Sequence, residues 1–317
     1  MIAAHPTRLL LITGAAGKTG LAVISRLLAL EAADPGDLPS LTNLRIRALA
    51  RNAGQRTLLE KAGVRDTVVA DLNDPTALAK ALQGADSVYH VCPNVHPQEA
   101  SIGRSIIALA RQAGVRRFVL HSVLQPGIRE MPHHWAKMSV EAALAESGLE
   151  FAIVQPAPYM QNILGQRVSI CEQGVYSVPY HPATRVSMVD LEDVAEAVVR
   201  VLAGFDTSGG RQHTAAHFEA TYELCGPGLL DQTEIATQLG RALRREVRAE
   251  ALGREGWAKS AHRAGMSRYQ VETLLAMFRY YERCGMTGSA QPLENLLGRP
   301  PATFAQFAER TFGVQPG

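Results

Sequence analysis

The sequence predicts an α/β protein in which a doubly wound parallel sheet is followed by a smaller, mainly helical C-terminal cap domain. Short apolar runs alternate with longer helical patterns through the first half of the chain. These runs show no polar alternation, which is typical of parallel strands buried on both faces. The last third of the chain loses this alternation, and the spacing of its apolar residues predicts helices.

The first half supplies the predicted strands and the crossover helices between them. Parallel strands need long connections, so each intervening helix is expected to form a right-handed crossover. Proline at the first helical position sacrifices no hydrogen bond, so Asp74-Pro75 predicts a helix start. The strands are expected at Leu9–Thr13, Leu44–Ala50, Thr67–Ala70, Ser87–Val91, Phe118–Ser122 and Phe151–Gln155, with helices beginning near Lys18, Gln55, Pro75, His96 and His134.

The second half is predicted to complete the sheet and to add the cap. Residues 1–158 and 186–228 are assigned to a dinucleotide-binding domain, and residues 159–185 and 229–317 to a substrate-binding cap. A ligand is then expected between the carboxyl edge of the sheet and the cap. The further strands are expected at Val186–Met188 and Tyr222–Leu224, and the helices at Leu191–Leu202, Thr233–Leu243, Glu255–Ala264, Tyr269–Arg283 and Thr303–Arg310.

Composition argues against several classes of partner. The 317 residues include 32 Lys and Arg against 30 Asp and Glu, a net charge of +2, without the basic stripe that a nucleic acid requires. No apolar run is long enough to predict a membrane span. The four cysteines are well separated, which is typical of reduced thiols, so a cytoplasmic location is expected.

A glycine-rich loop follows the first predicted strand and opens the first predicted helix. Its glycines, Gly14, Gly17 and Gly20, suit a tight turn, close approach of the backbone to a pyrophosphate, and close packing of helix on strand. The helix start would then face the phosphates. This context predicts a Rossmann dinucleotide site. A triphosphate-binding loop is excluded because position 12, where it needs glycine, is Ile12. The expected contacts also include Ala16, Lys18 and Thr19.

The end of the second predicted strand favours NADP(H) over NAD(H). An acidic residue there would bind the adenosine ribose, but the strand ends in Arg51-Asn52. A guanidinium can hold a 2′-phosphate with two parallel hydrogen bonds. Asp71 and Leu72, after the third strand, are expected to meet the adenine. The expected cofactor site also includes Cys92, Asn94 and Ser122.

Taken together, these motifs resemble the NmrA-like branch of the atypical short-chain dehydrogenases. The resemblance implies NAD(P) binding. It also implies either reduction of quinones, dyes or benzylic ethers, or redox sensing without turnover. It rests on Thr13–Gly20, Ala48–Asn52, Phe118–Leu124, Glu150–Asn162, Val189–Ala195 and Leu296–Pro301.

The resemblance also identifies the expected catalytic segment, in which this chain differs from the usual motif at one position. Short-chain dehydrogenases generally carry Tyr-x-x-x-Lys, and this chain has His133 and Lys137 in those positions. Lys137 is expected to contact the nicotinamide ribose, and His133 or Tyr159 is a candidate proton donor. Pro156 and Tyr159 are expected to wall the nicotinamide. Without the tyrosine acid, acceptors that delocalise the incoming charge are favoured over isolated ketones.

The leading hypothesis is an NADPH-dependent reductase of a quinone, enone or other conjugated small molecule. A non-catalytic NAD(P) sensor and an NAD(P)-using isomerase or lyase remain alternatives. The expected partner is the small-molecule substrate, with a homodimer as one possible assembly. No metal site is expected, because His213 and His217 have helical spacing but lack an adjacent glutamate and a third ligand.

Overall fold

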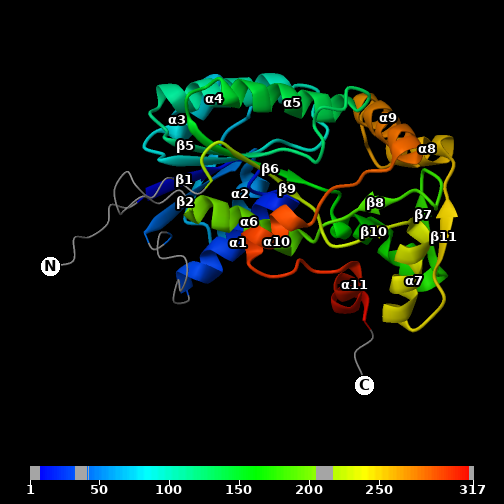
Figure 1. The fold of residues 1–317 in the computed structure, drawn as a ribbon. Helices are drawn as coiled ribbons and strands as arrows, with labels where there is room; N and C mark the ends of the chain where they lie inside the picture. The colour runs from blue at the N-terminus through cyan, green and yellow to red at the C-terminus, as the bar shows by residue number, and fades with distance from the viewer. Residues whose placement is uncertain (1–7, 33–40, 42, 205–216, 314–317) are drawn as a thin grey trace. The chain divides into compact units, whose positions relative to one another are not determined.

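The computed structural model describes residues 8–32, 41, 43–204 and 217–313, which divide into two compact units (Figure 1). The first unit comprises residues 1–126, 136–155 and 195–222, and the second comprises residues 127–135, 156–194 and 223–317. The domain boundaries expected from the sequence differ from the boundaries of these compact units, and they stay a prediction.

The first unit is built on the predicted doubly wound sheet. Its strand order is β3-β2-β1-β4-β5-β6-β9, and the pairs from β3 through β6 are parallel. The order reverses between β1 and β4, and such a switch point opens a crevice at the carboxyl ends of the strands. The strands are β1 Arg8–Ile12, β2 Leu44–Ala50, β3 Asp66–Val69, β4 Ser87–Val91, β5 Arg117–His121, β6 Glu150–Pro156 and β9 Ala220–Leu224.

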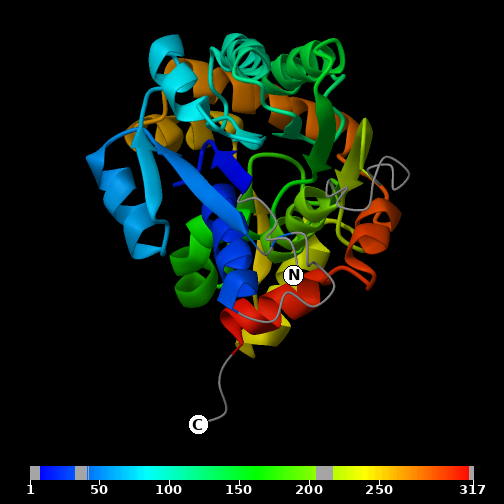
Figure 2. The same cartoon turned by 90° about the vertical axis from the view of Figure 1, so that its left-hand side faces the viewer.

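Helices cover both faces of this sheet. In Figure 1 α3, α4 and α5 lie on one face and α1 and α6 on the other, and Figure 2 shows α3, α4 and α5 side by side. Arg26 of α1 pairs with Glu196 of α6 at 3.3 Å on the second face. The helices are α1 Lys18–Ala32, α2 Ala53–Lys61, α3 Pro75–Leu82, α4 Glu99–Gln112, α5 Pro132–Ala145 and α6 Leu191–Ala203.

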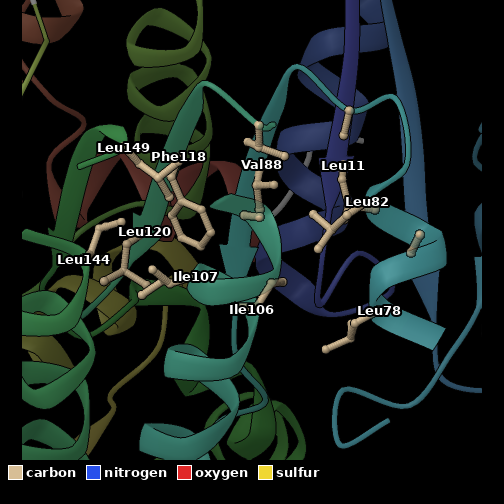
Figure 3. Close-up of a cluster of buried hydrophobic side chains, with 14 of the residues drawn as sticks. Leu11, Leu78, Leu82, Val88, Ile106, Ile107, Phe118, Leu120, Leu144 and Leu149 are labelled. Atoms are coloured by element: carbon tan, nitrogen blue, oxygen red, sulfur yellow. The ribbon is translucent and has the colours of Figure 1, made fainter. Parts of the chain in front are cut away.

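The core between the sheet and α3–α5 explains why the strands lack polar alternation. Phe118 is fully buried at its centre, and alternate residues of β1 face opposite sides, so Leu10 and Leu11 are both fully buried. Figure 3 shows the side chains of this cluster interdigitating across the layers. The cluster includes Leu11, Leu78, Leu82, Val88, Ile106, Ile107, Leu120, Leu144 and Leu149.

Local signals predict the starts of α1 and α3 correctly, whereas α2, α4 and α5 begin two or three residues away from their predicted starts. The Asp74 carboxylate accepts hydrogen bonds from the amides of Thr76 and Ala77 at 2.9 and 3.1 Å, so the predicted start of α3 is confirmed. Helix α4 begins at Glu99 rather than near His96. The chain first turns through Val95, whose φ is 51° and therefore not helical.

The second unit contains short strands as well as helices. Strand β7 (Val175–Val178) pairs in parallel with β11 (Arg248–Ala251), and β8 (Val186–Ser187) pairs antiparallel with β10 (Leu229–Leu230). Of these, only β8 was predicted, because two to four residues carry too little periodicity to identify a strand. The helical segments are η2 Met160–Gln166, η3 Ser169–Gln173, α7 Gln232–Leu243, α8 Arg254–Arg263, α9 Arg268–Cys284, α10 Gln291–Leu297 and α11 Phe304–Phe312.

Two buried aspartates near the start of α6 hold the C-terminal segment of this unit. Asp193 accepts hydrogen bonds from Arg299 at 2.8 Å and from the Ala302 amide at 2.6 Å. Asp190, fully buried, pairs with Arg310 of α11 at 2.5 Å. The motif segments 189–195 and 296–301, distant in sequence, therefore meet in one hydrogen-bonded cluster.

Across the described residues, no helix combines the length and hydrophobicity needed to cross a lipid bilayer.

Candidate nucleotide and active site

The glycine loop connects β1 to α1, as predicted. Gly14 has a φ of +60°, and a Cβ there would lie 2.5 Å from the carbonyl oxygen of Val91 at the end of β4. A Cβ on Gly20 would lie 2.5 Å from the Gly14 carbonyl oxygen and 2.6 Å from Ala15 Cα. Gly17 is exposed, and its added Cβ would meet the Gly14 carbonyl oxygen at 3.1 Å. Gly14 and Gly20 are thus required by packing, while Gly17 leaves the loop surface bare for a ligand.

The remaining loop residues continue into the first turn of α1. Ala16 is half-buried, Lys18 is the first residue of the helix, and the side chain of Thr19 is buried. The first amides of a helix have no partner within it and carry a partial positive charge. Partial burial lowers the pKa of Lys18. The loop and helix start therefore form a cradle suited to an anion such as a pyrophosphate.

Arg51 directly follows β2 and has an exposed side chain. Its amide donates to the side chain of Gln55 at 2.8 Å, while Asn52 caps α2 by accepting from the Gln55 amide at 3.0 Å. Among the described residues, no carboxylate pairs with the Arg51 guanidinium. Nearby arginines are engaged, with Arg47 on Asp66 and Arg56 on Glu60. Arg51 is therefore available to a phosphate.

Asp71 and Leu72 lie just beyond β3, on the same edge of the sheet. The Asp71 carboxylate is exposed and accepts hydrogen bonds from the Asn73 amide at 2.8 Å and its side chain at 3.2 Å. Leu72 is half-buried against the core cluster. Their predicted contact with an adenine stays a prediction.

Lys137 is engaged by a carboxylate that the sequence analysis did not identify. Its Nζ donates to Oε1 of Glu99, the first residue of α4. Glu99 is 3% exposed, and within the described residues its Oε2 is buried without a hydrogen-bond partner. The one sequence signal for Glu99 is an acidic residue in the first turn of a helix, where the helix dipole favours it.

The ion pair opens onto a small cavity at the carboxyl ends of β4 and β5. The cavity volume is about 10 Å³, which suits a single water molecule and excludes a nicotinamide ring. The predicted residues Cys92, Ser122 and Lys137 therefore come together here, whereas Asn94 is exposed beyond it. The lining residues are His90, Cys92, Glu99, Leu120, His121, Ser122, Lys137 and Val140.

Two buried histidines beside this cavity are neutral. His90 Nδ1 lies 2.8 Å from the Thr13 hydroxyl, and His121 Nδ1 lies 2.8 Å from the Tyr89 hydroxyl. Burial, and secondarily the nearby Lys137 charge, lowers the pKa of each ring to about 3. Burial raises the pKa of the Cys92 thiol to about 12, so it also stays protonated. The charges lining the cavity at neutral pH are therefore those of Glu99 and Lys137.

Ser122 is oriented by a second buried acid. Its hydroxyl donates to Glu141 of α5, and the Gln155 amide donates to both oxygens of the same carboxyl at 2.9 and 3.0 Å. Burial raises the pKa of Glu141, while these hydrogen bonds and the charge of Lys137 oppose the shift. The single proton of Ser122 is thus committed to Glu141.

The remaining predicted active-site residues belong to the second unit. His133 is buried, and its ring lies edge-on to His134 with 4.5 Å between centroids. Tyr159 is half-buried before η2 and bridges to Val189, while Pro156 is buried at the end of β6. Their predicted approach to the nicotinamide stays a prediction.

Only one histidine of the His-x-x-x-His pattern lies among the described residues. His217 forms a 2.7 Å hydrogen bond with Tyr222, and His213 lies outside the described residues. Among the residues that the structure describes, no group of histidine, cysteine, aspartate and glutamate side chains could hold a metal ion.

Comparison with known proteins gives consistent matches over most of the chain. A model of the NmrA-like family matches residues 6–301. NAD(P)H azoreductase of Xenophilus azovorans is 30% identical over 272 residues, which cover 84% of this chain and 89% of that protein. (4-Alkanoyl-5-oxo-2,5-dihydrofuran-3-yl)methyl phosphate reductase of Streptomyces griseus is 30% identical over 306 residues, covering 95% of this chain and 96% of that protein.

A solved structure supports the same fold. The NADPH-dependent quinone oxidoreductase of Escherichia coli, complexed with NADPH, aligns with a TM-score of 0.77 at 24% sequence identity. The alignment covers 96% of this chain and all of that one.

Gly20→Ala should destabilise the protein despite the better helix propensity of alanine. The gain in helix propensity is about 1 kcal/mol. The new Cβ would lie 2.5–2.6 Å from backbone atoms of Gly14 and Ala15, so the loop must shift, and the net loss in the free energy of unfolding should be about 1–3 kcal/mol. Gly54→Ala in α2 is the matched control, because an added Cβ there meets Asn52 at 3.4 Å and should stabilise slightly. Urea unfolding measures both. Equal stability of the two variants would contradict this account of Gly20.

Acid should destabilise the fold through the two buried histidines. Their folded pKa lies below the ordinary value of 6.5, so below that pH the unfolded chain binds protons that the native state does not. The contribution of the two rings to the free energy of unfolding is therefore fully present above pH ~6.5. It decreases as the pH falls, by about 1.4 kcal/mol per pH unit for each ring.

His121→Gln should make this slope shallower by about 1.4 kcal/mol per pH unit between about pH 6 and pH 4. The exposed His262→Gln serves as the control. Urea unfolding at several pH values gives the slopes, and an unchanged slope in His121→Gln would show that the ring titrates in the folded state.

Proposed function

The chain belongs to the NmrA-like family, and on that premise we propose that it is an NADPH-dependent reductase of conjugated small molecules. The observation that carries the proposal is a glycine loop with an exposed backbone at the start of α1, together with the Arg51 guanidinium after β2, which no carboxylate of the described residues binds. The first suits a pyrophosphate and the second an additional phosphate.

The proposed cofactor contacts divide between these two places. Gly14, Gly17 and Gly20 shape the backbone against the pyrophosphate, and Arg51 binds the 2′-phosphate that distinguishes NADPH from NADH. Lys137 is proposed to bind the nicotinamide ribose. NADPH, when bound, supplies a hydride to the acceptor, and the protein orients the two and excludes water.

The lack of a tyrosine proton donor favours conjugated acceptors. His133 replaces the tyrosine acid, and the nearby Ser122 hydroxyl already donates its proton to Glu141, so neither a tyrosine nor Ser122 is available to protonate an isolated alkoxide. A quinone, azo compound or enone spreads the incoming charge and can take its proton afterwards, from His133, Tyr159 or water. The names of the relatives support this class, because they specify an azo compound, a quinone and an unsaturated lactone.

The proposal places the reaction in the cytoplasm with a small molecule as the partner. All four cysteines are free thiols, as that compartment favours. A homodimer and the absence of a nucleic-acid partner remain predictions.

Turnover is tested by following NADPH oxidation in the stopped flow with a panel of quinones, enones and azo dyes, and with simple ketones for comparison. The proposal expects oxidation with conjugated acceptors and none with simple ketones. Binding of NADPH without turnover of any acceptor would instead support a redox sensor, and absence of binding would contradict both.

Arg51→Asp should weaken NADPH binding by about 10- to 100-fold, because it removes a charge-assisted bidentate contact and adds repulsion. The affinity for NADH should change less than about threefold. Arg56→Asp is the matched control, since Arg56 is exposed on the next helix and already pairs with Glu60. Calorimetric titration with each dinucleotide measures the effect. Equal losses for NADPH and NADH would show that Arg51 is not the phosphate ligand.

A further inference from the structure

The ion pair between Glu99 and Lys137 is buried at the carboxyl edge of the sheet. The side chains are 3% and 14% exposed, respectively. One carboxylate oxygen binds the ammonium, and within the described residues the other is buried without a hydrogen-bond partner, while both side chains line the cavity. The pair joins the first residue of α4 to the middle of α5.

Stability does not explain why the chain keeps such a pair. Removing two charges from water is costly, and replacing a buried pair with apolar residues is often neutral or stabilising. An apolar pair could also fill this position, because Leu120 and Val140 already line the same cavity. A role for the charges themselves is the better explanation.

The pair makes the lining of the cavity electrically neutral. Burial keeps His90, His121 and Cys92 uncharged, as their shifted pKa values indicate. The carboxylate of Glu99 then cancels the ammonium of Lys137. Glu141, which accepts the Ser122 hydrogen bond, does not line the cavity, although its carboxyl also interacts electrostatically with Lys137.

This neutrality has a consequence for a coenzyme whose ring changes charge. The reduced nicotinamide ring is uncharged, and the oxidised ring carries one positive charge. A lone buried ammonium beside it would disfavour the oxidised form, because charges interact strongly where water is excluded.

We propose that Glu99 is a positioning residue that fixes the Lys137 ammonium and cancels its charge, so that the site holds both oxidation states of the coenzyme. The inference rests on the proposed function, which places the nicotinamide ribose against Lys137 and therefore the ring next to, not inside, the cavity of about 10 Å³.

The test is the ratio of the Kd for NADP⁺ to the Kd for NADPH, measured by calorimetry without any acceptor. Glu99→Gln keeps the shape of the side chain but removes its charge, and should raise the ratio about tenfold. Lys137→Met leaves the carboxylate and should lower the ratio by a similar factor. The double variant should return it close to the wild-type value, because neither charge remains.

The controls separate this role from a structural one. Glu130→Gln removes the charge of an exposed glutamate that pairs with Arg283, and should leave the ratio unchanged. If Glu99→Gln fails to fold in thermal unfolding, Lys137→Met and the double variant test the same claim, since the double variant leaves no buried charge unpaired.

Three results would contradict the proposals, two of them the role of Glu99 and one the proposed function. Equal weakening of both oxidation states in Glu99→Gln would show a merely structural role and overturn the inference. Unchanged ratios in both single variants would do the same. Failure of the wild-type protein to bind either form would contradict the proposed function instead.

Discussion

The polar side chains around the carboxyl ends of β4 and β5 are buried, and the structure of this region depends on their being paired. A parallel sheet covered on both faces by helices excludes water from the ends of its strands as well as from its core. Lys137 consequently pairs with Glu99, His121 with Tyr89, and Ser122 with Glu141. The first pair joins α4 to α5, the second joins β4 to β5, and the third joins the end of β5 to α5.

Close packing imposes a second constraint on the same edge. Gly14 has no room for a Cβ because the loop after β1 lies against Val91 at the end of β4, and Gly20 has none because the first turn of α1 lies against the loop itself. The amides of the helix start are thereby brought to the switch point between β1 and β4, where an open sheet accepts a ligand. The anion cradle is thus a consequence of how helix, loop and strand pack. Gly17 is the one glycine of the three that is not required by this packing, and it leaves the loop surface without a side chain.

The second unit uses a similar pairing for a different purpose. Asp190 and Asp193 are buried and bind Arg310 and Arg299, which fastens the C-terminal segment to the start of α6. This explains why two short motifs separated by about a hundred residues both belong to the pattern that the sequence resembles. Their function within the unit is to hold it together, since both carboxylates are fully engaged.

The sequence by itself determined the order of strands and helices in the first unit, the glycine loop and the arginine at the end of β2, because each depends on local periodicity or on fixed spacing. It did not reveal β7, β10 and β11, which are too short to carry a period. Nor did it identify Glu99 or Glu141 as partners of Lys137 and Ser122. Only the tertiary structure brings these acids from separate helix positions to the ends of the strands, and burial, which no local pattern encodes, decides which side chains keep their charge.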